Sequence, residues 1–266
     1  MGADSGFLSR YGPWALVAGA SEGLGAEFAR QLADRGLNLL LIARRRAPLE
    51  KIAEELHRAH GVQVRTGALD LASADLLSSI QDLTDDIEVG MVVYNGAESI
   101  IGPFLEQELS DMLRTIDVNC RGPLILAHEL GRHMQARKRG GIIIVSSLAG
   151  SQGAPLLSTY AASKAFGLVL GEGLWGELRA GGVDVLAVSV GTTRTPRYQA
   201  SRPRKDPVSV MEVGPVVSQA FAALGQGPSA VPGRINQIAS FVMRRLLPRR
   251  YAVRLMGSQT RSLYGG

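Results

Sequence analysis

The sequence has a single cysteine and lacks several other features that mark particular classes of protein. Cys120 cannot form a disulfide within the chain, and no set of Cys and His residues has metal-ligand spacing. Residues 1–11 contain no apolar segment of a secretory signal, and no apolar run is long enough to span a bilayer. We therefore expect a cytoplasmic protein without a metal centre.

Aromatic residues are also scarce, at 5% of the chain, and no basic stripe with interspersed aromatics is present. A nucleic-acid partner is therefore not expected. The formal net charge of +5 is a mild excess that fits an anionic cofactor or substrate. The chain has 266 residues, of which 45% are hydrophobic, so we expect one α/β domain with a sizeable core over residues 1–266.

Short apolar runs alternate along the chain with longer helical patterns. Several runs are apolar at consecutive positions, which is typical of strands buried on both faces of a parallel sheet. The expected strands cover residues 14–18, 39–43, 62–66, 89–94, 142–146 and 183–190, and the expected helices cover 26–35, 49–60, 111–138 and 160–180. Gly36 should end the first of these helices, and Ser110 should cap the third. The alternation predicts an α/β fold, a Rossmann-like doubly wound parallel sheet of about seven strands with helices on both faces.

The first expected strand runs into a glycine-rich turn that precedes a helix. Glycines there permit a tight turn and let backbone N–H groups approach a pyrophosphate at the helix N-terminus. The spacing Gly-x-x-x-Gly-x-Gly differs from the common Gly-x-Gly-x-x-Gly, and an ordinary tight turn would also fit it. The strand before and the helix after it favour a dinucleotide site. The expected contacts are Gly19, Ser21, Glu22, Gly23, Leu24 and Gly25.

The second expected strand ends in Ala43-Arg44-Arg45-Arg46, with no Asp or Glu. In this fold an acid at that point accepts the ribose 2′-OH of NAD, whereas an arginine suits the 2′-phosphate of NADP. Arg44 and Arg45 therefore favour NADP(H) as the cofactor. Glu22 in the glycine turn argues against NADP(H), because a nearby anion does not help to bind a 2′-phosphate. The alternative interpretation of Arg44-Arg45-Arg46 is a basic turn that is simply solvated.

Ser147 ends an expected strand, and Tyr160 and Lys164 follow it in an expected helix. Because Tyr160 and Lys164 are four residues apart, a helix places them on one face. A cation about 4 Å away lowers a tyrosine pKa from about 10 towards neutrality, where a general acid works best. Ser147 can hydrogen-bond a substrate oxygen as charge develops.

With the glycine turn upstream, this serine, tyrosine and lysine resemble the reactive centre of the short-chain dehydrogenase/reductase family, over most of the chain. The resemblance implies that Tyr160 protonates a carbonyl oxygen, that Lys164 lowers its pKa and holds the nicotinamide ribose, and that Ser147 polarises the carbonyl. It assigns Asn119 to a proton-relay water. Further implied cofactor contacts are Asp70, Leu71, Asn95, Gly96, Ala97, Tyr160, Val190, Gly191, Thr193 and Thr195. Three segments depart from the family pattern: Gly96 and Ala97 are swapped, Val190 replaces a proline, and Ala18 stands where the family often has threonine.

The resemblance implies reduction of a hydrophobic carbonyl substrate, such as a 3-oxoacyl thioester or a steroid-like ketone. The alternatives are an NAD-using alcohol dehydrogenase and a non-enzymatic NADP(H)-binding regulatory protein. A homodimer or homotetramer is expected by analogy. Residues 192–215 should form a substrate lid, with basic side chains at Arg194, Arg197, Arg202, Arg204 and Lys205. The basic segment 235–266 is expected to pack on the domain rather than to lie on a membrane surface.

Overall fold

The computed structural model describes residues 5–200 and 209–264. Part of the expected lid, with Arg202, Arg204 and Lys205, lies outside the described residues, as do the last two residues of the basic segment. All of the predicted catalytic and cofactor-binding residues lie within the described ranges.

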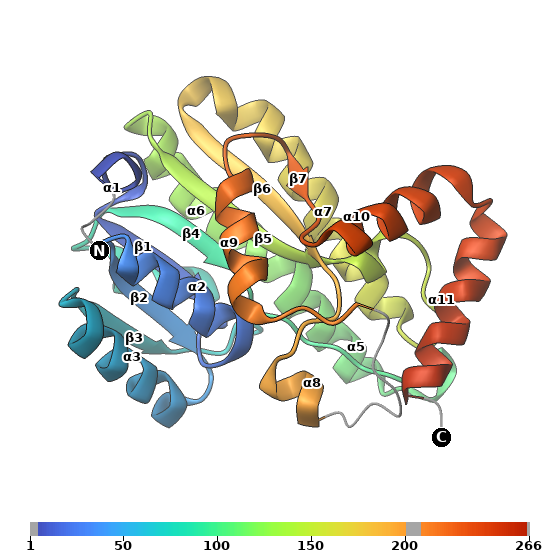
Figure 1. The fold of residues 1–266 in the computed structure, drawn as a ribbon. Helices are drawn as coiled ribbons and strands as arrows, with labels where there is room; N and C mark the ends of the chain where they lie inside the picture. The colour runs from blue at the N-terminus through green and yellow to red at the C-terminus, as the bar shows by residue number, and fades with distance from the viewer. Residues whose placement is uncertain (1–4, 201–208, 265–266) are drawn as a thin grey trace.

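Seven parallel strands form one sheet in the order β3-β2-β1-β4-β5-β6-β7 (Figure 1). In chain order they are β1 (Trp14–Ala18), β2 (Asn38–Ala43), β3 (Val64–Ala68), β4 (Val89–Tyr94), β5 (Gly140–Ser147), β6 (Val183–Val190) and β7 (Ser229–Ala230). The predicted fold is thus confirmed, although the third strand begins two residues later than expected. The strand order reverses between β1 and β4, and ligands of such sheets bind in the crevice beyond that point.

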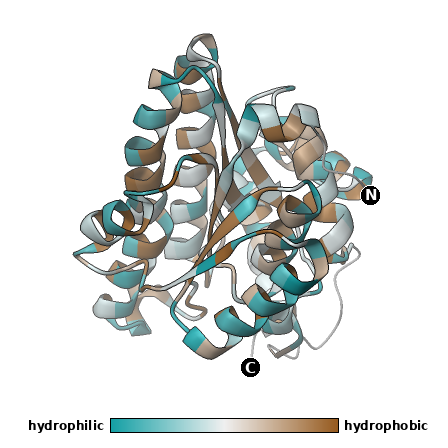
Figure 2. Cartoon of the chain, turned by 90° about the vertical axis from the view of Figure 1, so that its left-hand side faces the viewer, coloured by the Kyte–Doolittle hydropathy of each residue, from teal (hydrophilic) through white to brown (hydrophobic). Residues whose placement is uncertain are grey.

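Helices cover both faces of the sheet, as Figure 2 shows with the apolar residues gathered between the layers. The helices are α1 (Ser5–Tyr11), α2 (Gly23–Asp34), α3 (Arg46–His60), α4 (Leu76–Thr84), α5 (Leu109–Ile116), α6 (Gly122–Ala136), α7 (Ser158–Leu178), α8 (Pro196–Ala200), α9 (Val213–Ala223), α10 (Arg234–Phe241) and α11 (Arg249–Tyr264). Side chains of α2, α3 and α9 share one core cluster, and side chains of α4, α6 and α7 pack in the other. Alternate strand residues enter opposite clusters, because successive side chains of a strand point to opposite faces.

The expected 111–138 helix is interrupted by a π-helical turn, η2 (Asp117–Arg121), between α5 and α6. The buried Tyr94 hydroxyl donates to the Val118 carbonyl at 2.5 Å, which satisfies one carbonyl within this turn. The capping prediction for Ser110 is wrong, because Glu108 precedes the first helical residue, Leu109. π-turns inside α-helices are frequent at functional sites, and this one contains Asn119.

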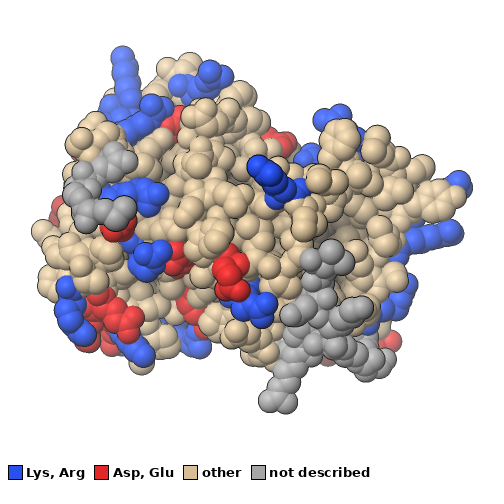
Figure 3. All heavy atoms as spheres, in the orientation of Figure 1, with Lys and Arg blue, Asp and Glu red and all other residues tan. Residues whose placement is uncertain are grey.

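The C-terminal segment forms α10, a π-turn η5 (Val242–Leu246) and α11, at the right of Figure 1. From Val213 to the end of the sequence there is no Asp or Glu. Arginines on this segment stand out at the right-hand edge of the molecule in Figure 3. Within the described residues, no helix combines the length and apolarity needed to cross a membrane.

Candidate active site

The glycine turn has the geometry of a close-approach site at the carboxyl end of β1. Gly19 adopts φ +82°, a conformation that favours glycine. A Cβ at Gly25 would lie 1.9 Å from the Gly19 carbonyl oxygen, so only glycine lets α2 start so close to the turn. The first N–H groups of a helix have no partner within it, and α2 begins at Gly23. This cradle fits a pyrophosphate.

Two further predicted segments border the cradle. On the β4 side, the Asn95 backbone N–H donates to the Ala18 carbonyl, and its Nδ2 donates to the Gly19 carbonyl, both at 2.9 Å. On the β6 side, a Cβ at Gly23 would lie 3.1 Å from the Thr195 methyl group. The ends of β1, β4 and β6 therefore bring their predicted cofactor contacts together around one turn.

The swap of Gly96 and Ala97 has a physical reason. A Cβ at Gly19 would lie 2.7 Å from the Gly96 Cα, so the two turns touch through their backbones. A Cβ at Gly96 would in turn lie 2.3 Å from the Leu71 Cδ1. The small residue is needed at position 96, where Leu71 packs under the turn.

Arg44 and Arg45 both pair with glutamates that border the cradle. Arg45 Nη2 lies 2.6 Å from Glu22 Oε2, and Arg44 Nη2 lies 3.4 Å from Glu98 Oε2. Both arginine side chains are more than half exposed. The structure thus supplies two guanidinium groups beside the turn, each already facing a carboxylate.

Asp70, which lies two residues after the end of β3, accepts two hydrogen bonds at 2.9 Å from Arg114 Nη2, one on each carboxylate oxygen. Its carboxylate also accepts from the Ala72 backbone N–H at 3.0 Å. Burial raises the pKa of this carboxyl, but the Ala72 and Arg114 hydrogen bonds outweigh it and hold the pKa below its usual value. Asp70 is therefore a fixed anion at the rim of the crevice.

The three expected reactive residues come from the end of β5 and the first turns of α7. Lys164 is buried, and its Nζ donates to the Val145 carbonyl at 2.9 Å. The same Nζ lies 5.8 Å from the centroid of the Tyr160 ring. The pKa of Lys164 is lowered to about 8, chiefly by burial; Cys120 raises it, and the positive charge of Arg197 contributes to the lowering.

Ser147 ends β5 and begins a short 3-10 turn, η3 (Leu148–Ser151). Its hydroxyl accepts from the Ala149 N–H at 3.2 Å, which fixes the turn. The neighbouring Ser146 hydroxyl donates to the Lys164 carbonyl at 2.7 Å and so ties β5 to α7. The strand and the helix are thus locked together at the level of the predicted reactive residues.

Asn119 is buried in the π-turn, and its amide bridges two segments. Oδ1 accepts from the Glu98 N–H, and Nδ2 donates to the Glu98 carbonyl, both at 2.8 Å. Nδ2 also donates to the Ser163 hydroxyl at 2.9 Å, next to Lys164. These contacts give Asn119 a positioning role, and its part in a proton relay stays a prediction.

The segment after β6 is held by the C-terminal region. A Cβ at Gly191 would lie 2.6 Å from the Asn236 Nδ2 of α10, and Thr193 pairs with Met211 in an isolated parallel bridge. Val190 is buried at the end of β6, where the family pattern has proline. Thr195 accepts from the Tyr198 N–H at 3.2 Å, which places its side chain at the start of α8.

Sequence reasoning missed Glu98 and Arg114, although both lie among the predicted contacts. Glu98 directly follows Asn95-Gly96-Ala97, and Arg114 is one of many arginines on helices. Residue type and spacing give no sign that these side chains meet, because they come from different segments.

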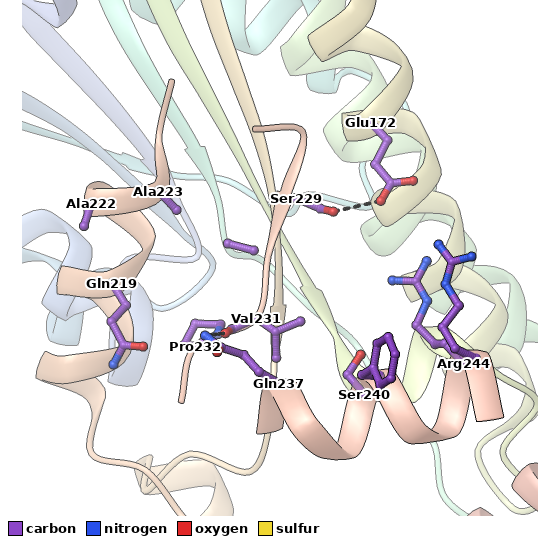
Figure 4. Close-up of a pocket in the computed structure, with 13 residues that line it drawn as sticks. Glu172, Gln219, Ala222, Ala223, Ser229, Val231, Pro232, Gln237, Ser240 and Arg244 are labelled. Atoms are coloured by element: carbon purple, nitrogen blue, oxygen red, sulfur yellow. Dashed lines mark hydrogen bonds between the residues drawn. The ribbon is translucent and has the colours of Figure 1, made fainter. Parts of the chain in front are cut away.

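A separate cleft of about 680 Å³ lies between α7, α9, β7 and α10 (Figure 4). Its lining includes Glu172, which accepts from the Ser229 hydroxyl at 2.9 Å, and Arg244. The predicted reactive residues do not line it. The cleft is therefore distinct from the candidate active site.

Two comparisons with curated proteins agree in family but differ in substrate. The chain is 31% identical over 234 residues to a 7β-hydroxysteroid dehydrogenase of Clostridium sardiniense, covering 87% of this chain and 89% of that protein. It is 36% identical over 179 residues to a very-long-chain 3-oxoacyl-CoA reductase of Neurospora crassa, covering 65% of this chain and 54% of that longer protein.

Solved structures extend the similarity to three dimensions. A structure of a 7β-hydroxysteroid dehydrogenase superposes with a TM-score of 0.90 at 27% identity, covering 94% of this chain and 98% of the other. A short-chain dehydrogenase from Sphingobium yanoikuyae in complex with NADPH gives 0.75 at 31% identity, covering 83% and 87%. The family model for short chain dehydrogenases matches residues 13–206. The chain therefore belongs to the short-chain dehydrogenase/reductase family of oxidoreductases.

Proposed function

We propose that this oxidoreductase uses NADP(H) to interconvert a ketone and a secondary alcohol, and that it works as a reductase of a hydrophobic carbonyl substrate. The observation that carries the proposal is the buried Lys164 ammonium, 5.8 Å from the Tyr160 ring and beside the end of β5. A buried cation at that distance stabilises a tyrosinate. A tyrosine with a lowered pKa is a competent general acid near neutral pH.

Each residue then has one task in the reduction. Tyr160 donates its hydroxyl proton to the carbonyl oxygen, and Lys164 stabilises the phenolate that remains. Ser147 donates a hydrogen bond to the same carbonyl oxygen and so polarises it. NADPH, when bound, supplies the hydride that reduces the carbonyl carbon. Asn119 holds the turn after β4 against α7, so that the cofactor and proton-donor sides keep their spacing.

Support for NADP(H) over NAD comes from the arginines after β2 and from the NADPH complex of the Sphingobium protein. No acid follows β2 to accept a ribose 2′-OH. Glu22, whose negative charge argues against a 2′-phosphate, is paired with Arg45 at 2.6 Å. Arg44 is therefore the side chain that we assign to the 2′-phosphate.

Arg44→Ala is expected to weaken NADPH binding by about 10- to 100-fold and to leave NADH binding within about twofold. A charge-assisted hydrogen bond contributes about 1.5–3 kcal/mol, and only NADPH carries the phosphate that makes it. Dissociation constants from cofactor fluorescence measure both values. Arg58→Ala, which removes an exposed arginine from α3, is the matched control. Equal losses for the two cofactors would contradict the assignment of Arg44 to the 2′-phosphate, and NADH binding that is tighter than NADPH binding and ignores Arg44→Ala would favour the NAD-using alternative.

For the substrate, we propose a bulky hydrophobic ketone, either a steroid-like ketone or a 3-oxoacyl thioester. The names of the two curated relatives support these classes. We assign a second wall of the substrate site to α11, which packs on η3 and the loop after it: Arg249 Nη1 donates to the Ser151 carbonyl at 2.8 Å, and a Cβ at Gly257 would lie 3.0 Å from the Pro155 Cγ.

The test is NADPH consumption with steroid ketones, 3-oxoacyl thioesters and simple aromatic ketones. Turnover of one class identifies the substrate class. Tight NADPH binding without turnover of any class would favour the regulatory binding protein over the enzyme.

We also propose a homodimer or homotetramer in the cytoplasm. Apolar side chains are exposed on neighbouring segments, with Leu105 at 94%, Leu109 at 64% and Val169 at 65% of their maximum. Because Leu109 and Val169 lie on α5 and α7, which contact each other, their exposed side chains favour a buried contact between subunits.

A further inference from the structure

Three arginines from separate segments meet the carboxylate of Glu98. Oε2 lies 3.4 Å from Arg44 Nη2 and 3.8 Å from Arg114 Nε, and Oε1 lies 3.6 Å from Arg197 Nη2. The Glu98 side chain is only 20% exposed. The proposed reaction, as described above, gives this carboxylate no task.

The Arg44–Glu98 pair crosses the crevice. Arg44 follows β2, Glu98 follows β4, and β1 lies between these two strands in the sheet. The pair therefore spans the carboxyl end of β1, where the glycine turn begins. A dinucleotide on this turn whose 2′-phosphate reached Arg44 would place two anions, the phosphate and the Glu98 carboxylate, on the same guanidinium, where they compete for its charge.

Arg44 is the exchangeable member of the cluster. Arg114 is held independently by both carboxylate oxygens of Asp70 at 2.9 Å. Arg197 is held by the Ala97 carbonyl at 3.2 Å and by the Ser99 hydroxyl at 3.1 Å. Arg44, whose side chain is 56% exposed, makes the shortest of the three contacts with Glu98, at 3.4 Å.

The Glu98 backbone is fixed separately from its side chain. Its N–H and carbonyl are both bonded to the Asn119 amide at 2.8 Å. A substitution of the side chain therefore leaves the turn after β4 in place, and the charge can be tested without moving the backbone.

Resting on the proposed NADP(H) function, we propose that Glu98 is a specificity-determining residue that acts as an internal anion. It competes with the 2′-phosphate for Arg44 and so sets how tightly NADPH binds relative to NADH. When only a fraction of the protein holds the arrangement that binds the cofactor, the apparent affinity is the intrinsic affinity multiplied by that fraction.

The experiment measures NADPH and NADH dissociation constants for wild type, Glu98→Gln, Arg44→Ala and the double variant. Glu98→Gln should tighten NADPH binding by about three- to tenfold and NADH binding by less than about twofold, because only the 2′-phosphate uses the freed Arg44. In the Arg44→Ala background the same substitution should give no tightening. Glu54→Gln, which removes an exposed charge from α3, should change neither constant.

The outcomes separate the two proposals. Equal tightening for both cofactors, tightening that persists without Arg44, or no change in Glu98→Gln overturns the role of Glu98 alone. A wild-type protein that binds neither dinucleotide overturns the proposed function, and the role of Glu98 with it. Melting temperatures of all variants, expected to lie within about 2 °C of wild type, show that the fold is intact.

Discussion

Tyr160→Phe is expected to lower turnover of the carbonyl substrate by about 10²- to 10⁴-fold, the range in which a positioned general acid contributes. The substitution removes one oxygen and keeps the ring, whose centroid lies 5.8 Å from Lys164 Nζ. Packing of α7 on β5 therefore stays, and the loss comes from the missing proton. Single-turnover measurements with bound NADPH report the chemical step directly.

Cofactor binding separates this loss from a structural one. The dissociation constant for NADPH and the melting temperature should both stay close to wild type, because the cradle at Gly19 and Gly25 lies on other elements. Tyr11→Phe, which removes the hydroxyl that donates to Asp184 at the start of β6, away from the carboxyl ends of the strands, is the matched control and should turn over normally. Turnover in Tyr160→Phe at more than about a tenth of the wild-type rate would contradict the assignment.

The fold could be predicted because each strand has a strong local signal. Strands buried on both faces show continuous apolar runs, and β4 and β6 were expected with the observed bounds. Gly36 ends α2 as predicted, with φ +88° and a hydrogen bond from its N–H to the Ala33 carbonyl. The strand β7 has only two residues and no apolar run that marks it in the sequence. The sequence therefore predicts no residue range for this strand, which is included only in the expected number of about seven strands.

The features that were missed depend on contacts between distant segments. A π-turn adds one residue to a helical turn, and the spacing of apolar residues in the sequence does not reveal it. In this protein the π-turn places Asn119 against Glu98 and Ser163. The Glu98 cluster depends on arginines that lie 16, 54 and 99 residues from Glu98 in the chain. Ser110 carries a good capping side chain, but α5 begins before it, with Glu108 at the capping position.

Lys164→Met is expected to abolish turnover and yet to stabilise the fold at pH 7. A buried lysine whose pKa falls from 10.5 to about 8 costs the folded state about 3 kcal/mol while it is charged. Methionine removes the charge but leaves the Val145 carbonyl without its partner, which costs about 1 kcal/mol. The net gain of about 2 kcal/mol should raise the melting temperature by about 5 °C.

The pH dependence identifies the cause. Below pH 8 the lysine is protonated in both the folded and unfolded states, so the full cost of the buried charge is present. Between pH 8 and 10.5 the folded protein releases the proton first and the unfolded chain binds more protons, so wild-type stability rises with pH. The advantage of Lys164→Met should therefore shrink over this range and reverse near pH 10, where only the lost hydrogen bond remains.

Denaturant unfolding at pH 7 and pH 10 measures both free energies, with Lys51→Met, which removes an exposed lysine from α3, as the control that should change neither. A variant that is less stable than wild type at both pH values would mean that the Lys164 ammonium is well solvated or paired in the fold. In that case its effect on Tyr160 would be weaker than the proposed mechanism requires, because a solvated charge stabilises a nearby phenolate by far less than a buried one.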